Sequence, residues 1–294
     1  MTPLVPDHAT LRRLDRLTFR WRGLANPGFV RARGGPRPGS SRELLGVRAW
    51  ETGDDMRDLD WAATLRFGHA HVRVYERAVE GAVTLVIDTS ASMAFGAPPK
   101  LAYARALACA LGHVALAHHD RVGALAFANG PVARLPAGHG RRQWGALRDF
   151  CAAQEAGGRT AFDDVARRVG GQHGLCLILS DFCTPEVFAP GLARLRPHPV
   201  TPVALHLVSA EELDADLDGE LELVDCETGA IRSGTVGPNE RTAYRAGVQA
   251  LRSRVAAMCR DAGVPHVALS TSVPVVRCLE DTLVRAGILT PARS

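Results

Sequence analysis

The sequence is poor in lysine, in aromatic residues and in paired cysteines. Lys100 is the only lysine among 35 basic residues, and aromatic residues make up 5% of the 294 positions. Basic runs interleaved with stacking aromatic side chains are typical of nucleic-acid binding surfaces, and the sequence has none. Residues 1–80 hold 14 arginines against 10 acidic residues, while the remainder balances at 21 against 21. We therefore expect no nucleic-acid partner, and we place any electrostatic partner at the N-terminal part.

Long apolar runs and paired cysteine motifs are also missing. The seven cysteines are scattered, and none has the CxxC spacing of zinc or redox sites. The most apolar long run, residues 101–117, is too short to span a bilayer and contains Arg105 and His113. The first residues lack the apolar centre of a signal peptide. We expect a soluble, cytoplasmic protein with buried thiols and no membrane span.

From Gly81 onward, short apolar segments alternate with segments of helical length. This pattern is typical of a parallel sheet covered by helices on both faces. The predicted strands are 82–88, 121–128, 174–180, 202–208 and 265–271, with an antiparallel edge strand at 131–137 after the Asn129-Gly130 turn. The predicted helices are 99–118, 141–154, 161–169, 186–195, 239–262 and 275–286. The fold class is thus α/β, with a doubly wound and mostly parallel sheet.

The chain divides at about residue 80 into an N-terminal extension and a larger domain. Residues 1–79 are expected to hold a short amphipathic helix within 1–22, with Leu11, Leu14, Leu17 and Trp21 on one side, and a mobile Gly- and Pro-rich loop at 23–41. Two strands and a turn entering a helix follow. Residues 80–290 form the α/β domain, in which about 210–237 is an inserted hairpin that we expect to be a surface ornament.

Polar residues follow the first strand of this domain in the stretch VTLVIDTSASM. Asp88 ends the strand, and Ser90 and Ser92 come at alternate positions behind it, so the three side chains share one direction. Ligands of open parallel sheets bind outside the carboxyl ends of the strands. Thr160, after two glycines, and Asp181, after another buried strand, complete a set of five oxygen ligands. Hard oxygen ligands of low charge are suited to Mg²⁺ or Mn²⁺.

These five residues resemble the metal-ion-dependent adhesion site of von Willebrand factor A domains. In that family, a DxSxS sequence on one loop is joined by a threonine and an aspartate from two later loops, in the chain order seen here. The resemblance covers roughly residues 80–272 and implies a module that binds a partner's Asp or Glu through the metal. A site with two carboxylates also leaves a divalent cation under-neutralised, which favours one further anionic oxygen.

The stretch GDDMRDLDW, residues 53–61, carries a second resemblance. It is similar to a sequence signature of the bacterial domain-of-unknown-function family fifty-eight, with Leu59 where isoleucine is usual. The matching positions are Gly53, Asp54, Asp55, Arg57, Asp60 and Trp61. The resemblance extends over roughly residues 42–290 and implies an adaptor of a MoxR-type AAA+ ATPase in a chaperone-like system. For the motif itself we expect a structural or docking role: Asp54 or Asp55 caps a helix, Arg57 pairs with an acid, and Trp61 packs underneath.

Three alternatives compete with this interpretation. Asp88, Ser90 and Ser92 could merely cap backbone amides, although capping explains neither Thr160 nor Asp181. A metal-dependent hydrolase acting on phosphate esters is the rival function, but Ser90 stands where related phosphatases carry a second aspartate. A scaffold with a vestigial metal site is the third alternative. The chain lacks GxSxG, GxGxxG and P-loop motifs, so enzymes of those classes are not indicated.

Overall fold

The computed structural model describes residues 4, 6–20, 43–51, 54–76, 81–129, 132–170, 173–213 and 217–292. The chain divides into two compact units. The larger comprises Met1–Phe29 together with Gly81–Ser294, and the smaller comprises Val30–Glu80. The larger unit thus takes in the start of the chain, which we expect from the sequence to lie in an N-terminal extension.

A six-stranded sheet forms the centre of the larger unit, in the order β11-β8-β7-β4-β5-β6. All neighbouring strands pair in parallel except β6, which runs antiparallel to β5 at the edge. The strands are β4 (Ala82–Asp88), β5 (Arg121–Phe127), β6 (Ala133–Gly138), β7 (Gly174–Ser180), β8 (Val200–Val208) and β11 (His266–Ser270). The predicted mostly parallel sheet, including its antiparallel edge, is confirmed.

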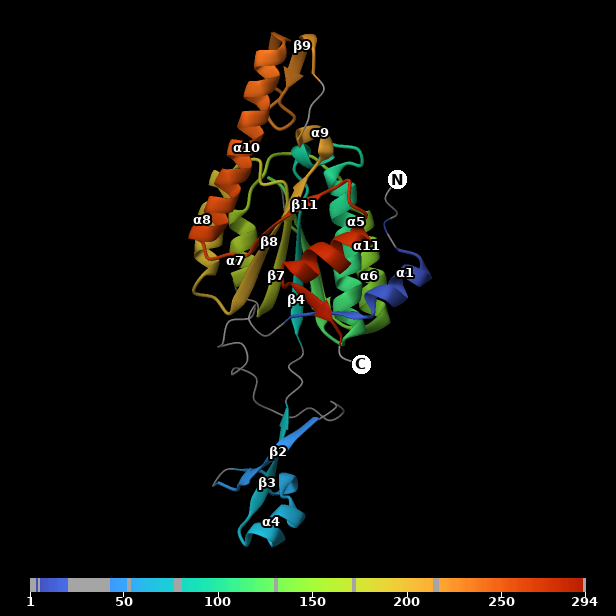
Figure 1. Cartoon of the computed structure of the whole chain (residues 1–294), viewed down its shortest axis with the longest axis vertical. Coiled ribbons are helices and arrows are strands. Elements are labelled where there is room, and N and C mark those ends of the chain that lie inside the picture. The colour runs from blue at the N-terminus through green and yellow to red at the C-terminus, as the bar shows by residue number, and fades with distance from the viewer. Residues whose placement is uncertain are drawn as a thin grey trace. The chain divides into compact units, whose positions relative to one another are not determined.

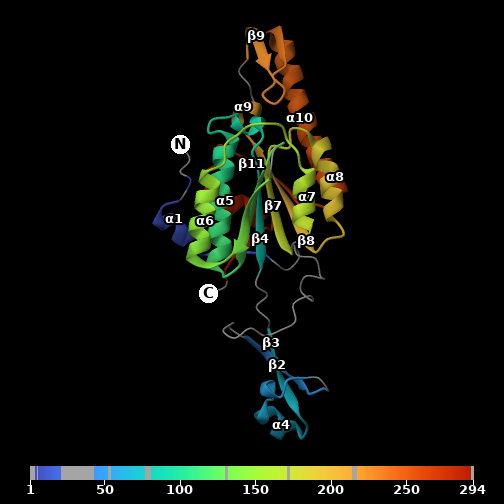
Figure 2. The ribbon, with the colours of Figure 1, turned by 180° about the vertical axis from the view of Figure 1, so that it is seen from behind.

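Alternate residues of the central strands face two separate hydrophobic cores. In β4, Leu85 and Ile87 lie in one core while Val86 lies in the other, and in β7 Leu177 and Ile178 divide in the same way. Such strands read as continuous apolar runs because both of their faces are buried. Helices α5 (Lys100–Ala117), α6 (Gly140–Ala152) and α11 (Val275–Arg277) cover one face, as Figures 1 and 2 show from opposite sides. Helices α7 (Asp163–Gly170), α8 (Pro185–Leu195) and α10 (Pro238–Asp261) cover the other. The sheet is therefore doubly wound.

After Gly81, six helices follow the predicted segments closely. They are α5 (Lys100–Ala117), α6 (Gly140–Ala152), α7 (Asp163–Gly170), α8 (Pro185–Leu195), α10 (Pro238–Asp261) and α11 (Val275–Arg277). A short helix in the insertion, α9 (Ala210–Leu213), is not among the predicted ones. The predicted helix at 275–286 continues beyond α11 as a π-helical segment, η3 (Cys278–Leu283), and a short 3₁₀ turn, η2 (Ala91–Ala94), precedes α5. None of the helices in the described part of the chain combines the length and the apolar character needed to traverse a bilayer.

The first residues of the chain differ from the predicted amphipathic helix. Helix α1 (His8–Leu14) ends early, and β1 (Leu17–Phe19) pairs antiparallel with β12 (Leu289–Pro291). Leu17 therefore lies in a strand, because its partner comes from the far end of the chain and no local pattern could reveal it. Trp21 and the predicted mobile loop at 23–41 lie outside the described residues.

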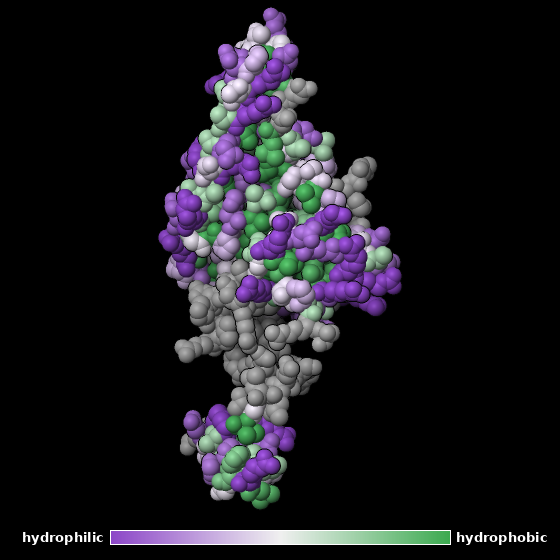
Figure 3. All heavy atoms as spheres, viewed as in Figure 1, coloured by the Kyte–Doolittle hydropathy of each residue, from purple (hydrophilic) through white to green (hydrophobic). Residues whose placement is uncertain are grey.

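The smaller unit consists of a two-stranded antiparallel ribbon and a short helix. The elements are β2 (Glu43–Ala49), η1 (Met56–Asp58), α4 (Trp61–Phe67) and β3 (His71–Glu76). Apolar side chains lie on its surface, visible as green spheres in Figure 3. Trp61 is 67% exposed and Leu65, one helical turn later, is 84% exposed. The expectation that Trp61 packs underneath the motif is therefore wrong.

An insertion between β8 and α10 contains helix α9 and a hairpin. Strands β9 (Gly219–Val224) and β10 (Ile231–Val236) pair antiparallel, as the acidic segment and its ETG turn predict. The hairpin is at the top of Figure 1, at the same end of the molecule as α9. This is also the end at which the parallel strands of the central sheet finish, because β8 leads directly into α9.

Candidate metal centre at the sheet rim

The site begins where β4 and β7 end side by side. Ile87 and Leu179 are paired across the two strands, so the next residues, Asp88 and Ser180, are neighbours at the rim. The Ser180 hydroxyl donates a 2.6 Å hydrogen bond to Oδ2 of Asp88, and the Ser90 amide donates a 2.9 Å bond to Oδ1. Asp88 is completely buried. Both oxygens of a buried carboxylate are thus held in place by neutral donors.

The two serines of the DxSxS sequence lie on the same loop as Asp88. Ser90 and Ser92 are buried, and their Oγ atoms are 3.1 Å apart. A hydrogen bond also joins Ser92 to the Asp181 carboxylate. Ligands at neighbouring positions of an octahedral shell of radius about 2.1 Å are roughly 3 Å apart. The two hydroxyls therefore have the separation that adjacent ligands of one ion would have.

Thr160 reaches the rim on a second loop, which is bound to the first through its backbone. The Ala91 amide donates to the Gly158 carbonyl over 2.9 Å, and the Gly157 amide donates to the Thr89 carbonyl over 2.8 Å. Gly158 has a φ of +74°, and a Cβ there would lie 2.2 Å from the Asn129 side chain. The positive φ therefore favours glycine at this position, and a Cβ there would also displace the Asn129 side chain. The Thr160 hydroxyl itself donates to Glu227.

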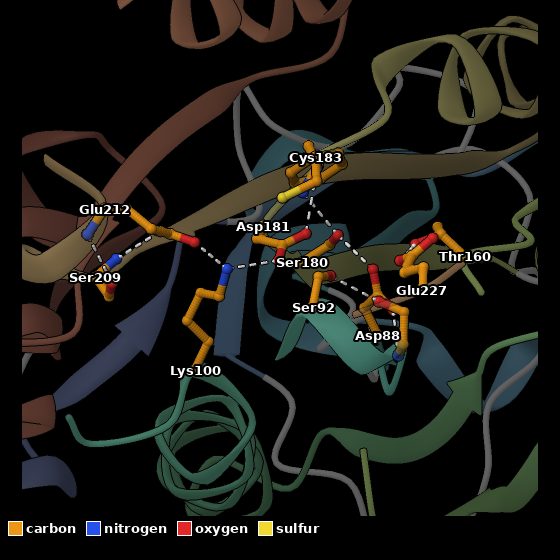
Figure 4. Close-up of polar contacts among 12 residues, drawn as sticks. Asp88, Ser92, Lys100, Thr160, Ser180, Asp181, Cys183, Ser209, Glu212 and Glu227 are labelled. Carbon is orange, nitrogen blue, oxygen red and sulfur yellow. Dashed lines mark hydrogen bonds and ion pairs between the residues drawn. The ribbon is translucent and has the colours of Figure 1, made fainter. Parts of the chain in front are cut away.

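Asp181 lies between the metal-ligand candidates and a buried lysine. Nζ of Lys100, at the start of α5, donates a 2.7 Å hydrogen bond to Oδ2 of Asp181 and also bonds Glu212 of α9. Lys100 is only 1% exposed. Burial alone would lower the pKa of Lys100, but the charges of Asp181 and Glu212 raise it, so the lysine stays an ammonium ion. Figure 4 shows Lys100 and Glu212 on one side of Asp181, and Ser92 and Asp88 on the other.

The two buried aspartates have opposite pKa shifts. Burial, followed by the negative charge of Asp181, raises the pKa of Asp88 to about 7. For Asp181, burial opposes ionisation, but the Lys100 ammonium outweighs it and lowers the pKa. Asp181 is therefore stable as an anion at neutral pH, whereas the ionised form of Asp88 is disfavoured. A divalent cation between them would stabilise the ionised form of both.

A second group of possible ligands surrounds Asp181 on the lysine side. One ligand atom each from Asp181, Cys183 and Glu212 lie within 4.8 Å of one another, close enough to hold a metal ion. Both carboxylates of this group already bond the Lys100 ammonium. The Lys100 ammonium therefore already neutralises this group, and a metal ion would have to displace it. For this reason we regard the oxygen-lined side of Asp181 as the better metal site.

The predicted oxygen set fits a hard divalent cation. Asp88, Ser90, Ser92 and Asp181 are connected by hydrogen bonds or by direct electrostatic interaction, and the backbone bonds described above bring the Thr160 loop alongside them. The set supplies two carboxylates and three hydroxyls, the ligand type that Mg²⁺ and Mn²⁺ prefer. Five protein ligands would leave one position of an octahedral shell for a further ligand.

Three side chains of this region are absent from the sequence prediction. Ser180 bonds Asp88, Glu212 bonds Lys100, and Glu227 bonds Thr160. Ser180 could have been found as the polar residue that ends a buried strand next to Asp181. Glu212 and Glu227 belong to the insertion at 210–237, which from its sequence we expect to be a surface ornament; instead it places two carboxylates at the rim.

The residues of the GDDMRDLDW motif form local capping and ion-pair contacts within the smaller unit. Asp55 caps η1 by accepting from the Arg57 amide over 2.9 Å, as expected for one of the two aspartates. Asp54 pairs with Arg48 at 2.6 Å, and Asp60 caps α4 and pairs with Arg73 at 2.9 Å. Gly53 lies outside the described residues. The acids thus order the turn that presents Trp61.

Sequence comparison decides the family. The model described as "Protein of unknown function DUF58" matches residues 46–254. This chain belongs to that family. "Uncharacterized protein Rv1480" of Mycobacterium tuberculosis is 31% identical over 245 residues, covering 80% of this chain and 76% of the relative. The family predicted from residues 53–61 is therefore confirmed.

Solved structures similar to this DUF58 chain include von Willebrand factor A proteins. "Conserved hypothetical protein BatB" from Bacteroides thetaiotaomicron aligns with a TM-score of 0.43 and 14% identity, over 70% of this chain and 98% of that protein. "von Willebrand factor type A from Catenulispora acidiphila" aligns with a TM-score of 0.38 and 13% identity, over 74% and 43%. Because these scores and identities are low, the interpretation of the site depends on the contacts within this chain.

Proposed function

We propose that this DUF58 protein is a metal-dependent protein-interaction module. Asp88, Ser90, Ser92, Thr160 and Asp181 bind Mg²⁺ or Mn²⁺, and the bound cation attracts an Asp or Glu of a partner protein. The observation that carries the proposal is the buried carboxylate Asp88, which has a raised pKa and neutral hydrogen-bond donors and faces a second carboxylate. Such a group requires a proton or a cation to be stable at neutral pH.

The partner is proposed on separate grounds. The resemblance to the family signature implies a cytoplasmic MoxR-type AAA+ ATPase, or a client of that ATPase, as the protein that presents the acidic residue. Five protein ligands support an acidic partner, because they leave one position of an octahedral shell, and a carboxylate oxygen is a ligand that hard cations prefer. A MoxR-type ATPase from the same bacterium is accordingly the protein to test first.

Paired serine substitutions test the metal site. In the Ser90→Ala/Ser92→Ala variant, we expect isothermal titration calorimetry with MgCl₂ or MnCl₂ to show a loss of affinity of at least about 10-fold, because two direct or water-mediated ligands are removed. Ser270 and Ser272 provide a matched control. They have the same spacing at the end of β11 and are bonded to each other over 2.7 Å. Ser270→Ala/Ser272→Ala should keep wild-type affinity.

Complex formation is tested with the same two variants. The purified MoxR-type ATPase should bind the wild type and the Ser270/Ser272 variant in Mg²⁺ and lose binding in EDTA, while the Ser90/Ser92 variant should not bind. Divalent-independent binding, or equal binding by all three proteins, would overturn the proposal. Phosphate-ester turnover that depends on Mn²⁺ and disappears in Asp88→Asn would instead support the hydrolase alternative.

A further inference from the structure

The turn of the β9–β10 hairpin has an ordered backbone. Oδ1 of Asp225 accepts hydrogen bonds from the Glu227 and Thr228 amides at 2.9 and 3.0 Å. The Gly229 amide donates to the Asp225 carbonyl over 2.7 Å, and the Asp225 amide donates to the Ala230 carbonyl over 2.9 Å. These bonds fix the backbone of the turn, and with it the direction in which the Glu227 side chain leaves the turn.

That residue, Glu227, points toward the candidate metal centre. Within the turn at 225–230 it is half-buried, whereas its five neighbours are exposed. Its Oε1 accepts a hydrogen bond from the Thr160 hydroxyl at 3.0 Å. Figure 4 shows the Glu227 carboxylate beside Thr160, on the same side of Asp181 as Asp88. The insertion therefore presents an acidic side chain to a proposed metal ligand.

Electrostatic contacts place the rest of the turn at the same rim. Hydrogen bonds from the Thr228 and Glu227 amides contribute most to lowering the pKa of Asp225, and the charge of Arg159, next to Thr160, lowers it further. Burial raises the pKa of the Cys226 thiol, and Glu227, Asp225 and Asp181 add to that effect. The turn thus interacts with both the Thr160 loop and the Asp181 loop.

The distance between the Thr160 hydroxyl oxygen and the Glu227 carboxylate oxygen can be compared with the spacing of metal ligands. Adjacent ligands of an octahedral ion at about 2.1 Å are roughly 3 Å apart. The Thr160–Glu227 distance of 3.0 Å and the Ser90–Ser92 distance of 3.1 Å both have this value. The same distances are those of ordinary hydrogen bonds, so they are compatible with neighbouring ligands of one ion. The Glu227 carboxylate is thus close enough to Thr160 to share an ion with it, and it offers the oxygen ligand that hard cations prefer.

We propose that Glu227 is an internal ligand of this site, which in the free protein takes the coordination position that a partner's acidic residue takes in the complex. The inference rests on the proposed function and adds its regulation. A carboxylate tethered in the same chain competes with an external one at high effective concentration. The partner then binds only as the hairpin turn withdraws. Removing Glu227 should strengthen external binding by a factor of 1/f, where f is the fraction of sites that Glu227 leaves open.

Glu227→Gln tests the proposal in the full chain loaded with Mn²⁺, with acetate as the probe carboxylate. Water-proton relaxation counts the waters on bound Mn²⁺. We expect the variant to hold about one more water per ion than the wild type, and to bind acetate at least about 5-fold more tightly. Glu220→Gln, which removes the same charge from an exposed position of the same hairpin, should match the wild type.

The outcomes separate the two proposals. If Mn²⁺ binds all three proteins and Glu227→Gln matches the wild type in hydration and acetate affinity, the internal-ligand proposal is overturned and the metal site stands. If Mn²⁺ binds none of them, both proposals fail. Hydrogen exchange on the wild type provides a readout that needs no variant. Mg²⁺ should slow exchange of the amides at 225–230 at least about 10-fold, and unchanged exchange would count against Glu227.

Discussion

The two buried aspartates of the rim carry the same functional group but are stabilised differently. Asp181 accepts a 2.7 Å hydrogen bond from the Lys100 ammonium, which is part of the chain and cannot leave. Asp88 is held by the Ser180 hydroxyl and the Ser90 amide, both neutral. The pKa of Asp181 is accordingly lowered, whereas that of Asp88 is raised.

The two sides of the site therefore differ in the source of their positive charge: Asp181 has a counter-charge within the chain, and Asp88 has none among its hydrogen-bond partners. The Lys100 side has a counter-charge that is part of the chain, because one ammonium pairs with both Asp181 and Glu212. The Asp88 side depends on what the solution supplies, a proton at low pH or a divalent cation at neutral pH. Three substitutions test this comparison, in order of decreasing expected effect.

Lys100→Met should have the largest effect on stability. Removing the ammonium leaves Asp181 and the partly buried Glu212 without their counter-charge, and breaking a buried ion pair in this way costs about 3 to 5 kcal/mol. Urea unfolding at pH 7.5 in EDTA measures the loss. The exposed Arg13–Glu280 pair serves as the control, and Arg13→Met should cost no more than about 1 kcal/mol. Similar losses in both variants would remove the distinction between a buried, fixed counter-charge and a surface pair.

Asp88→Asn should change the pH dependence of stability. The folded-state pKa of Asp88, about 7, lies above its ordinary value of 3.8, so the folded chain binds more protons between these pH values. The contribution of Asp88 to the free energy of unfolding therefore falls as pH rises through this window, by on the order of 3 kcal/mol.

The measurement compares urea unfolding of the wild type and Asp88→Asn in EDTA from pH 4.5 to 8. The wild type should lose stability relative to the variant as pH increases. Mg²⁺ added at pH 8 should restore stability to the wild type and not to the variant. Parallel pH profiles would show that Asp88 is stable as an anion without any cation.

Ser180→Ala should have a smaller effect that is confined to high pH. The hydroxyl donates to Asp88, and a hydrogen bond to a charged group contributes about 2 kcal/mol. We expect most of this loss at pH 8, where Asp88 is ionised, and less at pH 5, where it is protonated in the absence of metal. Ser233→Ala on the hairpin, whose hydroxyl has only a 3.4 Å contact to Glu222, should show no such pH dependence. An equal loss at both pH values would mean that Ser180 acts through packing and through the 2.9 Å hydrogen bond that it accepts from the Phe182 amide, and not through Asp88.

The central strands could be predicted accurately because their signal is local. The runs at 82–88 and 174–180 are observed with the predicted ends, since burial of both faces produces an uninterrupted apolar stretch. Leu17 was misassigned to a helix because its strand partner, Pro291, lies at the other end of the chain. The turn entering a helix is predicted correctly, but Trp61 is exposed, because nothing in the nine residues of the motif shows which face of that helix is covered.

The sequence by itself determined the doubly wound sheet and the family, because residue type and chain order carry that information. It also led to the proposal that Asp88, Ser90, Ser92, Thr160 and Asp181 are metal ligands. Only the tertiary structure decided their surroundings. Ser180 reaches Asp88 through strand register, Lys100 reaches Glu212 across the rim, and Glu227 reaches Thr160 through the hairpin. These contacts join residues separated by 67 to 112 positions, and packing alone brings such residues within bonding distance.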